Sequence, residues 1–148
     1  MIEKRIIGVD LGEKRVGVAI TDPLGLFAQP LCTLSGGKRE VINGLLKLVA
    51  QYTASTIVLG LPVEMSGIEG PQAIKVRGFA ELLEKRLKAV SKHLTKIAFV
   101  DERLTTVQAS RILHGNDIHG RDAKERVDQV SAALILEAWL AATPAADL

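Results

Sequence analysis

The chain has 148 residues, of which 47% are hydrophobic, and its net charge is only +2. This length fits one domain of ordinary size, and the apolar content is too high for a disordered chain. The single cysteine, Cys32, excludes an internal disulfide and a thiolate metal cluster, which favours a reducing, cytoplasmic location. No apolar stretch is long enough for a secretory signal or a membrane span, so no contact with a membrane is expected.

Three strands are predicted at the start of the chain. Residues 4–10 form an apolar run that is typical of a buried strand, and apolar residues alternate through 14–21. The short link between these runs predicts a hairpin. Residues 26–34 predict a third strand, which Pro30 restricts to an edge of the sheet because proline has no N–H to donate.

Two strand-and-helix units are predicted in the middle of the chain. Apolar residues recur at helical spacing from 41 to 52, and a short run rich in β-branched residues follows at 55–61. A loop with glycines and prolines at 62–71 separates this strand from a long amphipathic helix over 72–94.

The last third of the chain predicts one more strand, at 96–100, and two helices. A capping box opens a short helix over about 105–115, and a loop spans 115–122. The final helix runs from 122 to about 142, and the tail 143–148 is expected to be disordered.

The predicted order of elements is β-β-β-α-β-α-β-α-α, which indicates a single α/β domain over residues 1–148. Hairpins make the first three strands antiparallel, and the later β-α-β units add parallel strands. We therefore expect a five-stranded mixed sheet with helices packed on it. In the final helix, one inward-facing row consists of Val127, Val130, Leu134 and Ala138.

Acidic residues follow two of the predicted strands. Asp10 ends the first strand, and the pair Asp101 and Glu102 ends the strand at 96–100. The carboxyl ends of parallel strands meet at one edge of a sheet, where α/β proteins bind ligands. Asp128 lies about two turns into the final helix and would join them if that helix starts near this edge. The alternative for Asp10 is a turn residue that caps the hairpin.

Carboxylates that converge at one edge repel one another, and a divalent cation relieves that repulsion. Oxygen ligands without cysteine or clustered histidine favour Mg²⁺ or Mn²⁺. Two such ions hold the attacking water and the leaving oxygen of a phosphodiester in nucleases and polymerases.

Four segments of the chain resemble, in order and spacing, the motifs of the YqgF/RuvX family: residues 8–22, 57–71, 100–109 and 126–140. That family has an RNase H-like fold and is described both as pre-16S rRNA nucleases and as Holliday junction resolvases. The resemblance implies that Asp10, Glu102 and Asp128 are the catalytic carboxylates and hold Mg²⁺ or Mn²⁺, with Asp101 as a further candidate ligand. Because adjacent residues of a strand point to opposite faces, we expect only one of Asp101 and Glu102 to face the metal.

Basic residues near the motifs are candidates for contacts with nucleic acid: Lys14, Arg15, Lys75, Arg77 and Arg103. The segment 75–96 carries seven Lys or Arg against two acidic residues, a local excess that suits a polyanion. The alternatives are a solvated helix face for that segment and exposure at the hairpin end for Lys14 and Arg15. For Arg103 the alternative is a salt bridge to Asp101.

Three functions fit these features. The first is a metal-dependent endonuclease that trims the 5′ end of pre-16S rRNA in ribosome biogenesis. The second is a resolvase of four-way DNA junctions, which needs a homodimer because a junction is two-fold symmetric, whereas RNA trimming needs only a monomer. The third is a non-catalytic nucleic-acid-binding, transcription or ribosome-assembly factor. An ATP-binding domain of the actin and sugar-kinase type is disfavoured, because such proteins need two domains around the nucleotide.

Overall fold

The computed structural model describes residues 5–90, 94–105 and 120–144. Its elements, in chain order, are β1 (Ile6–Leu11), β2 (Arg15–Thr21), β3 (Ala28–Ser35), α1 (Lys38–Tyr52), β4 (Thr56–Leu61), α2 (Pro71–Val90), β5 (Lys96–Asp101), the 3₁₀ helix η1 (Glu102–Leu104) and α4 (Arg121–Ala142). The predicted strands and the three long helices are confirmed to within a few residues, whereas η1 was not expected. The helix predicted over 105–115 lies almost wholly outside the described residues.

The strands form one five-stranded mixed sheet in the order β3-β2-β1-β4-β5. β1 pairs with β2, and β2 with β3, in antiparallel fashion, while β1 with β4 and β4 with β5 are parallel. The predicted mixed sheet is therefore confirmed. β3 is an edge strand, as Pro30 required, and a bulge interrupts its pairing where Val18 pairs with Cys32 and Ala19 with Pro30.

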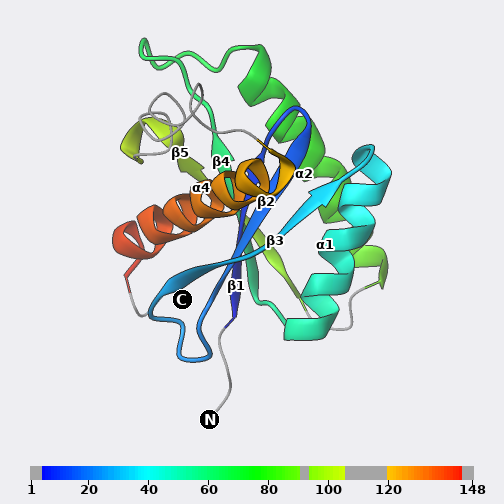
Figure 1. The fold of residues 1–148 in the computed structure, drawn as a ribbon. Helices are drawn as coiled ribbons and strands as arrows, with labels where there is room; N and C mark the ends of the chain where they lie inside the picture. The colour runs from blue at the N-terminus through cyan, green and yellow to red at the C-terminus, as the bar shows by residue number, and fades with distance from the viewer. Residues whose placement is uncertain (1–4, 91–93, 106–119, 145–148) are drawn as a thin grey trace.

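Of the helices that the structure describes, α1 and α2 cover one face of the sheet and α4 crosses the other (Figure 1). Alternation along β1 explains how one strand serves both layers. Ile7 and Val9 point into the larger core with α1 and α2, whereas Ile6 joins the smaller core under α4. None of the described helices has the length and apolar character that a membrane span requires.

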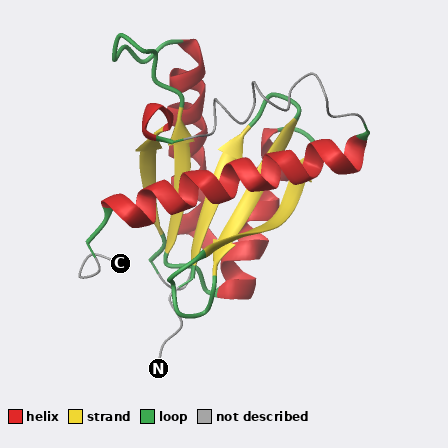
Figure 2. Ribbon diagram, turned by 60° about the vertical axis from the view of Figure 1, so that its left-hand side comes forward, coloured by secondary structure: helices red, strands yellow, loops and turns green. Residues whose placement is uncertain are grey.

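The inward row predicted for α4 is correct in part, because Leu134 and Ala138 pack half-buried against the smaller core. The residues that α4 buries are Ser131, Ala132, Ala133, Ile135 and Leu136, whereas Val130 is 44% exposed. α4 crosses this face of the sheet (Figure 2) and comes close to the strands at their glycines. A Cβ added at Gly8 of β1 would come within 2.7 Å of the Leu136 Cβ, so this packing needs glycine on the strand. Glycine on the strand therefore makes room for Leu136, and this orientation of α4 leaves Val130 partly exposed.

Candidate active site

Asp10 is a buried carboxylate at the carboxyl end of β1. It alternates with Ile6 and Gly8, so it belongs to the face that α4 covers rather than to the larger core. Its exposed fraction is only 4%. A carboxylate here costs stability that a hydrophobic residue would supply, which is the expected price of a functional group.

Gly17 of β2 brings Asp128 to the same place. Gly17 pairs with Asp10 across the β1–β2 ladder. A Cβ added at Gly17 would lie 2.0 Å from the main-chain oxygen of Asp128, so α4 rests directly on this glycine. Asp128 is thereby set beside the end of β1, as its position in the sequence predicted.

Glu102 reaches the site from the third direction. It follows β5 as the first residue of η1, and its exposed fraction is 3%. Gly60 of β4 leaves room for it, because a Cβ added there would lie 2.6 Å from Oε1 of Glu102. Leu59, the residue before Gly60, pairs with Val9 of β1. Glu102 therefore lies over β4, the strand next to Asp10.

The three carboxylates line one cavity of about 340 Å³ at the carboxyl edge of the sheet. Its other lining residues come from the β1–β2 hairpin, from β4 and the loop after it, and from α2: Leu11, Gly12, Glu13, Gly60, Pro62, Gln72 and Val76. Three residues that lie far apart in the sequence are therefore brought together as acidic neighbours. Glu13 and Gln72, which the sequence did not single out, also reach this cavity.

Asp101 does not line this cavity. Its carboxylate accepts hydrogen bonds from Nε of Arg103 at 2.9 Å, from Nη2 at 2.6 Å and from the backbone N–H of Arg103 at 2.9 Å. The Arg103 side chain holds the pKa of Asp101 below its usual range. Only Glu102 of this pair joins the site, and Arg103 makes the salt bridge that was the alternative to a phosphate contact.

Arg15 holds the third carboxylate. Its Nε donates to Oδ2 of Asp128 at 2.7 Å, and both side chains are about one-quarter exposed. Sequence reasoning missed this partner, which lies 113 positions away. The signal for the contact was Gly17, since a glycine inside a strand often marks close approach of another backbone. Lys14, the neighbour of Arg15, is exposed in the turn between β1 and β2.

The two basic residues predicted on α2 differ in their surroundings. Arg77 is bound to Glu69 by two hydrogen bonds, one of them 2.9 Å from Nη2 to Oε2, and its guanidinium lies 4.9 Å from the centre of the Phe99 ring. Arg77 thus fastens the loop after β4 to α2. Lys75 lies instead in a second cavity beside the acidic one.

Comparison with known proteins decides the family. The model of the RuvX family, described as a Holliday junction resolvase, matches residues 4–142. The chain belongs to this family. Curated relatives from Moorella thermoacetica, Clostridium acetobutylicum and Syntrophomonas wolfei carry the provisional name of a pre-16S rRNA nuclease. They are 41%, 40% and 39% identical to it over 92% of this chain and over 94%, 97% and 93% of their own lengths.

Solved structures agree on the fold of this RuvX family member. RuvC of Thermus thermophilus, solved with a Holliday junction substrate, matches 94% of this chain and 96% of its own with a TM-score of 0.56 at 11% identity. The yeast mitochondrial Holliday junction resolvase matches 94% and 78% with a TM-score of 0.53 at 12% identity. The fold is therefore RNase H-like. Family membership makes the chain a nuclease, a hydrolase of phosphodiester bonds.

The lining of the acidic cavity fits a divalent cation by its chemistry. Asp10, Glu102 and Asp128 offer only carboxylate oxygens, the ligands that Mg²⁺ and Mn²⁺ prefer. Within the described ranges, no three acidic, His or Cys side chains are already gathered closely enough to hold an ion. Asp128 forms an ion pair with Arg15 instead.

Proposed function

We propose that this RuvX family member is a metal-dependent endonuclease that cuts structured nucleic acid. The observation that carries the proposal is the convergence of Asp10, Glu102 and Asp128 on one cavity at the carboxyl edge of an RNase H-like sheet. A single domain over residues 1–148 is part of the proposal, and the family match over 4–142 supports it.

Asp10, Glu102 and Asp128 would hold Mg²⁺ or Mn²⁺. Such an ion supplies an activated water and neutralises charge on the phosphodiester. Burial of Asp10 and Glu102 excludes bulk water around their carboxylates and strengthens their attraction to a cation. Asp101, held by Arg103, has the role of a positioning residue that anchors the start of η1 and hence Glu102.

Arg15 has two partners in this proposal. In the structure it uses one of its five N–H donors on Asp128. Its contact with Asp128, which lines the cavity, and its place on the hairpin that also carries Lys14 suit contact with a backbone phosphate. A substrate phosphate that takes over Arg15 would leave Asp128 available to the cation, so binding of substrate and of metal would favour each other.

The substrate we propose is the precursor of 16S rRNA, cut at its 5′ end. The support is the name of the curated relatives, which share about 40% of their residues with this chain over nearly its whole length. Such processing accompanies ribosome assembly, which takes place in the cytoplasm. A second candidate is resolution of four-way DNA junctions by a homodimer, which the description of the family model favours.

The test is cleavage of labelled pre-16S rRNA and of a labelled four-way DNA junction side by side, with Mg²⁺, with Mn²⁺ and with a chelator. We expect metal-dependent cuts in the rRNA precursor that Asp10→Asn abolishes. Asp22→Asn is the matched control, because Asp22 lies in the β2–β3 turn at the opposite edge of the sheet. Cleavage of the junction alone would favour the resolvase, and binding without cleavage of either substrate would favour a non-catalytic factor.

A further inference from the structure

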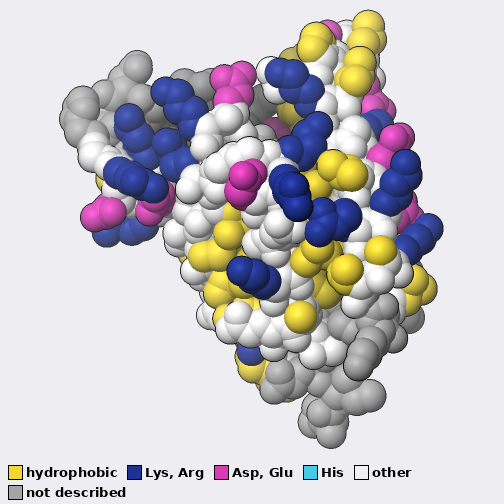
Figure 3. Space-filling model, turned by 90° about the vertical axis from the view of Figure 1, so that its right-hand side faces the viewer, with side chains coloured by type: hydrophobic (Ala, Val, Ile, Leu, Met, Phe, Trp, Pro, Cys, Tyr) yellow, Lys and Arg dark blue, Asp and Glu magenta, His cyan; other side chains and the backbone are white. Residues whose placement is uncertain are grey.

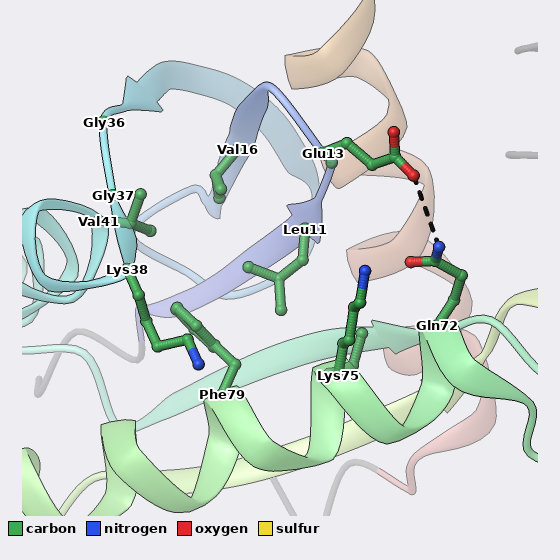
Figure 4. Close-up of a pocket in the computed structure, with 12 residues that line it drawn as sticks. Leu11, Glu13, Val16, Gly36, Gly37, Lys38, Val41, Gln72, Lys75 and Phe79 are labelled. Carbon is green, nitrogen blue, oxygen red and sulfur yellow. Dashed lines mark hydrogen bonds between the residues drawn. The ribbon is translucent and has the colours of Figure 1, made fainter.

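A second cavity, of about 500 Å³, lies directly beside the acidic one. The two share five lining residues from the β1–β2 hairpin and α2: Leu11, Gly12, Glu13, Gln72 and Val76. Gln72 donates a hydrogen bond of 3.5 Å to Glu13 at the boundary between them (Figure 4). A strand of nucleic acid in the acidic cavity can therefore continue into the second cavity without leaving the protein surface.

Apolar side chains from three parts of the fold form about half of the wall of the second cavity, and polar groups form the rest. The hairpin contributes Leu11 and Val16, α1 contributes Val41, and α2 contributes Val76 and the ring of Phe79. A hydrated inorganic anion gains nothing from these apolar side chains, whereas a nucleobase buries apolar surface against them. The volume lies within the range of about 300–1,000 Å³ that is usual for small-molecule pockets.

Two lysines supply the positive charge. Lys38 at the start of α1 and Lys75 of α2 both direct their ammonium groups into the cavity (Figure 4). In the parts of the chain that the structure describes, neither has a carboxylate as an ion-pair partner. The one acidic residue of the lining, Glu13, turns toward Gln72 instead.

The partial positive charge at the N-terminus of α1 adds little to this attraction. The carboxylate of Glu40, in the first turn of the helix, lies against Gly37, since a Cβ added at Gly37 would come within 2.9 Å of Oε2 of Glu40. The cavity lies on the face that carries α1 and α2, where Figure 3 shows Lys and Arg side chains beside apolar atoms. Its attraction for anions therefore depends on Lys38 and Lys75.

We propose that this cavity binds one unpaired nucleotide of the substrate strand, next to the phosphodiester that is cut. The base lies against the apolar side chains of the wall, and its phosphate lies between Lys38 and Lys75. This inference rests on the proposed nuclease function and deepens it. Continuous duplex cannot fill such a site, because its bases are stacked and paired, so the cavity selects substrates with an unpaired nucleotide beside the cut.

Binding to two short RNAs tests the proposal. One is a blunt duplex and the other is the same duplex with a single-stranded extension, both measured by fluorescence anisotropy on the full chain in chelator. We expect the extended duplex to bind more tightly. Each lysine that contacts a phosphate of a single strand makes the slope of log K against log salt steeper by about 0.7. At about 0.1 M salt this corresponds to about fivefold in affinity.

Lys38→Ala and Lys75→Ala should each lose about that factor on the extended duplex and far less on the blunt one. The matched controls are Lys47→Ala on α1 and Lys85→Ala on α2, which remove exposed lysines outside the cavity. A photoreactive thiouridine in the extension should crosslink to residues that line the cavity. Equal loss in the cavity and control variants, or crosslinks only elsewhere, would overturn the proposal.

Two further outcomes separate this inference from the function on which it rests. A free nucleoside monophosphate that binds as tightly as the extended duplex, with the same dependence on Lys38 and Lys75, would assign the cavity to a free nucleotide and overturn the proposal. If the wild type cuts RNA with metal and the double variant cuts every substrate equally well, the nucleotide site is wrong and the nuclease stands. If the wild type cuts nothing but binds the extension through both lysines, the nuclease proposal fails instead.

Discussion

Replacing Gly17 by Ala should damage both stability and catalysis, because α4 rests on this glycine. The new Cβ would lie 2.0 Å from the main-chain oxygen of Asp128, where real contacts stay above 3.0 Å, so helix and strand must separate by at least about 1 Å. Overpacking of this kind costs up to about 3 kcal/mol, since both neighbours are backbone and cannot rotate away. Loss of chain entropy in the unfolded state offsets up to about 1 kcal/mol of it.

A net loss of about 2 kcal/mol corresponds to a fall in Tm of about 4–8 °C for a domain of this size. A displacement of about 1 Å at Asp128 should also lower the cleavage rate about a hundredfold. Thermal unfolding by circular dichroism and single-turnover cleavage measure the two effects. Gly78→Ala on α2 is the control. Nothing lies within 4 Å of its added Cβ, so its free energy of unfolding should rise by up to about 1 kcal/mol. If Gly17→Ala unfolds and cleaves like the wild type, the described contact between α4 and β2 is wrong.

Three further predictions concern charged groups. Asp10→Asn should abolish metal-dependent cleavage and raise the free energy of unfolding by about 1 kcal/mol, because one of several neighbouring negative charges is removed; unchanged cleavage would reject the assignment. Arg15→Ala should cost less than about 1 kcal/mol of stability, since its pair with Asp128 is partly exposed. In a binding titration with RNA it should lower the affinity and make the affinity less dependent on salt. The Arg77 hydrogen bonds hold the pKa of Glu69 below 4.5, so their contribution to stability is present above that value and is lost as the pH falls through the lowered pKa. NMR titration should show the pKa of Glu69 rising toward 4.5 in Arg77→Ala. An unchanged pKa would contradict the contact between Arg77 and Glu69.

Periodicity was enough to predict the layers of the fold. Alternation of apolar residues in the first two strands, helical spacing before and after the strand at 55–61, and Pro30 at an edge all express local preferences that the tertiary structure keeps. η1 could not be predicted in this way. A single turn of helix has no period, and it forms here because Asp101 caps it through the backbone of Arg103.

The position of the carboxylates could be predicted, but not their partners. Asp10 and Glu102 end strands that had to be parallel neighbours of β4, so topology alone brings them to one edge. The pairing of Asp128 with Arg15 depends on how far α4 is rotated on the sheet. The sequence placed Val130 inward because it is hydrophobic, whereas Gly8 and Gly60 on the strands make room for Leu136 and Ile135 instead.

The contact of α4 with Gly17 also sets the order in which the parts of the proposed active site come together. Asp10 leaves the ribosome well before Asp128, because it precedes Asp128 in the chain. A partly synthesised chain can form its hairpin and most of its sheet while one of the three proposed catalytic carboxylates is still missing. Because α4 docks on Gly17 and Gly17 pairs with Asp10, β1 and β2 have to pair before Asp128 can join the proposed site. Under the proposed function, a partly synthesised chain therefore lacks a complete set of metal ligands until α4 has docked.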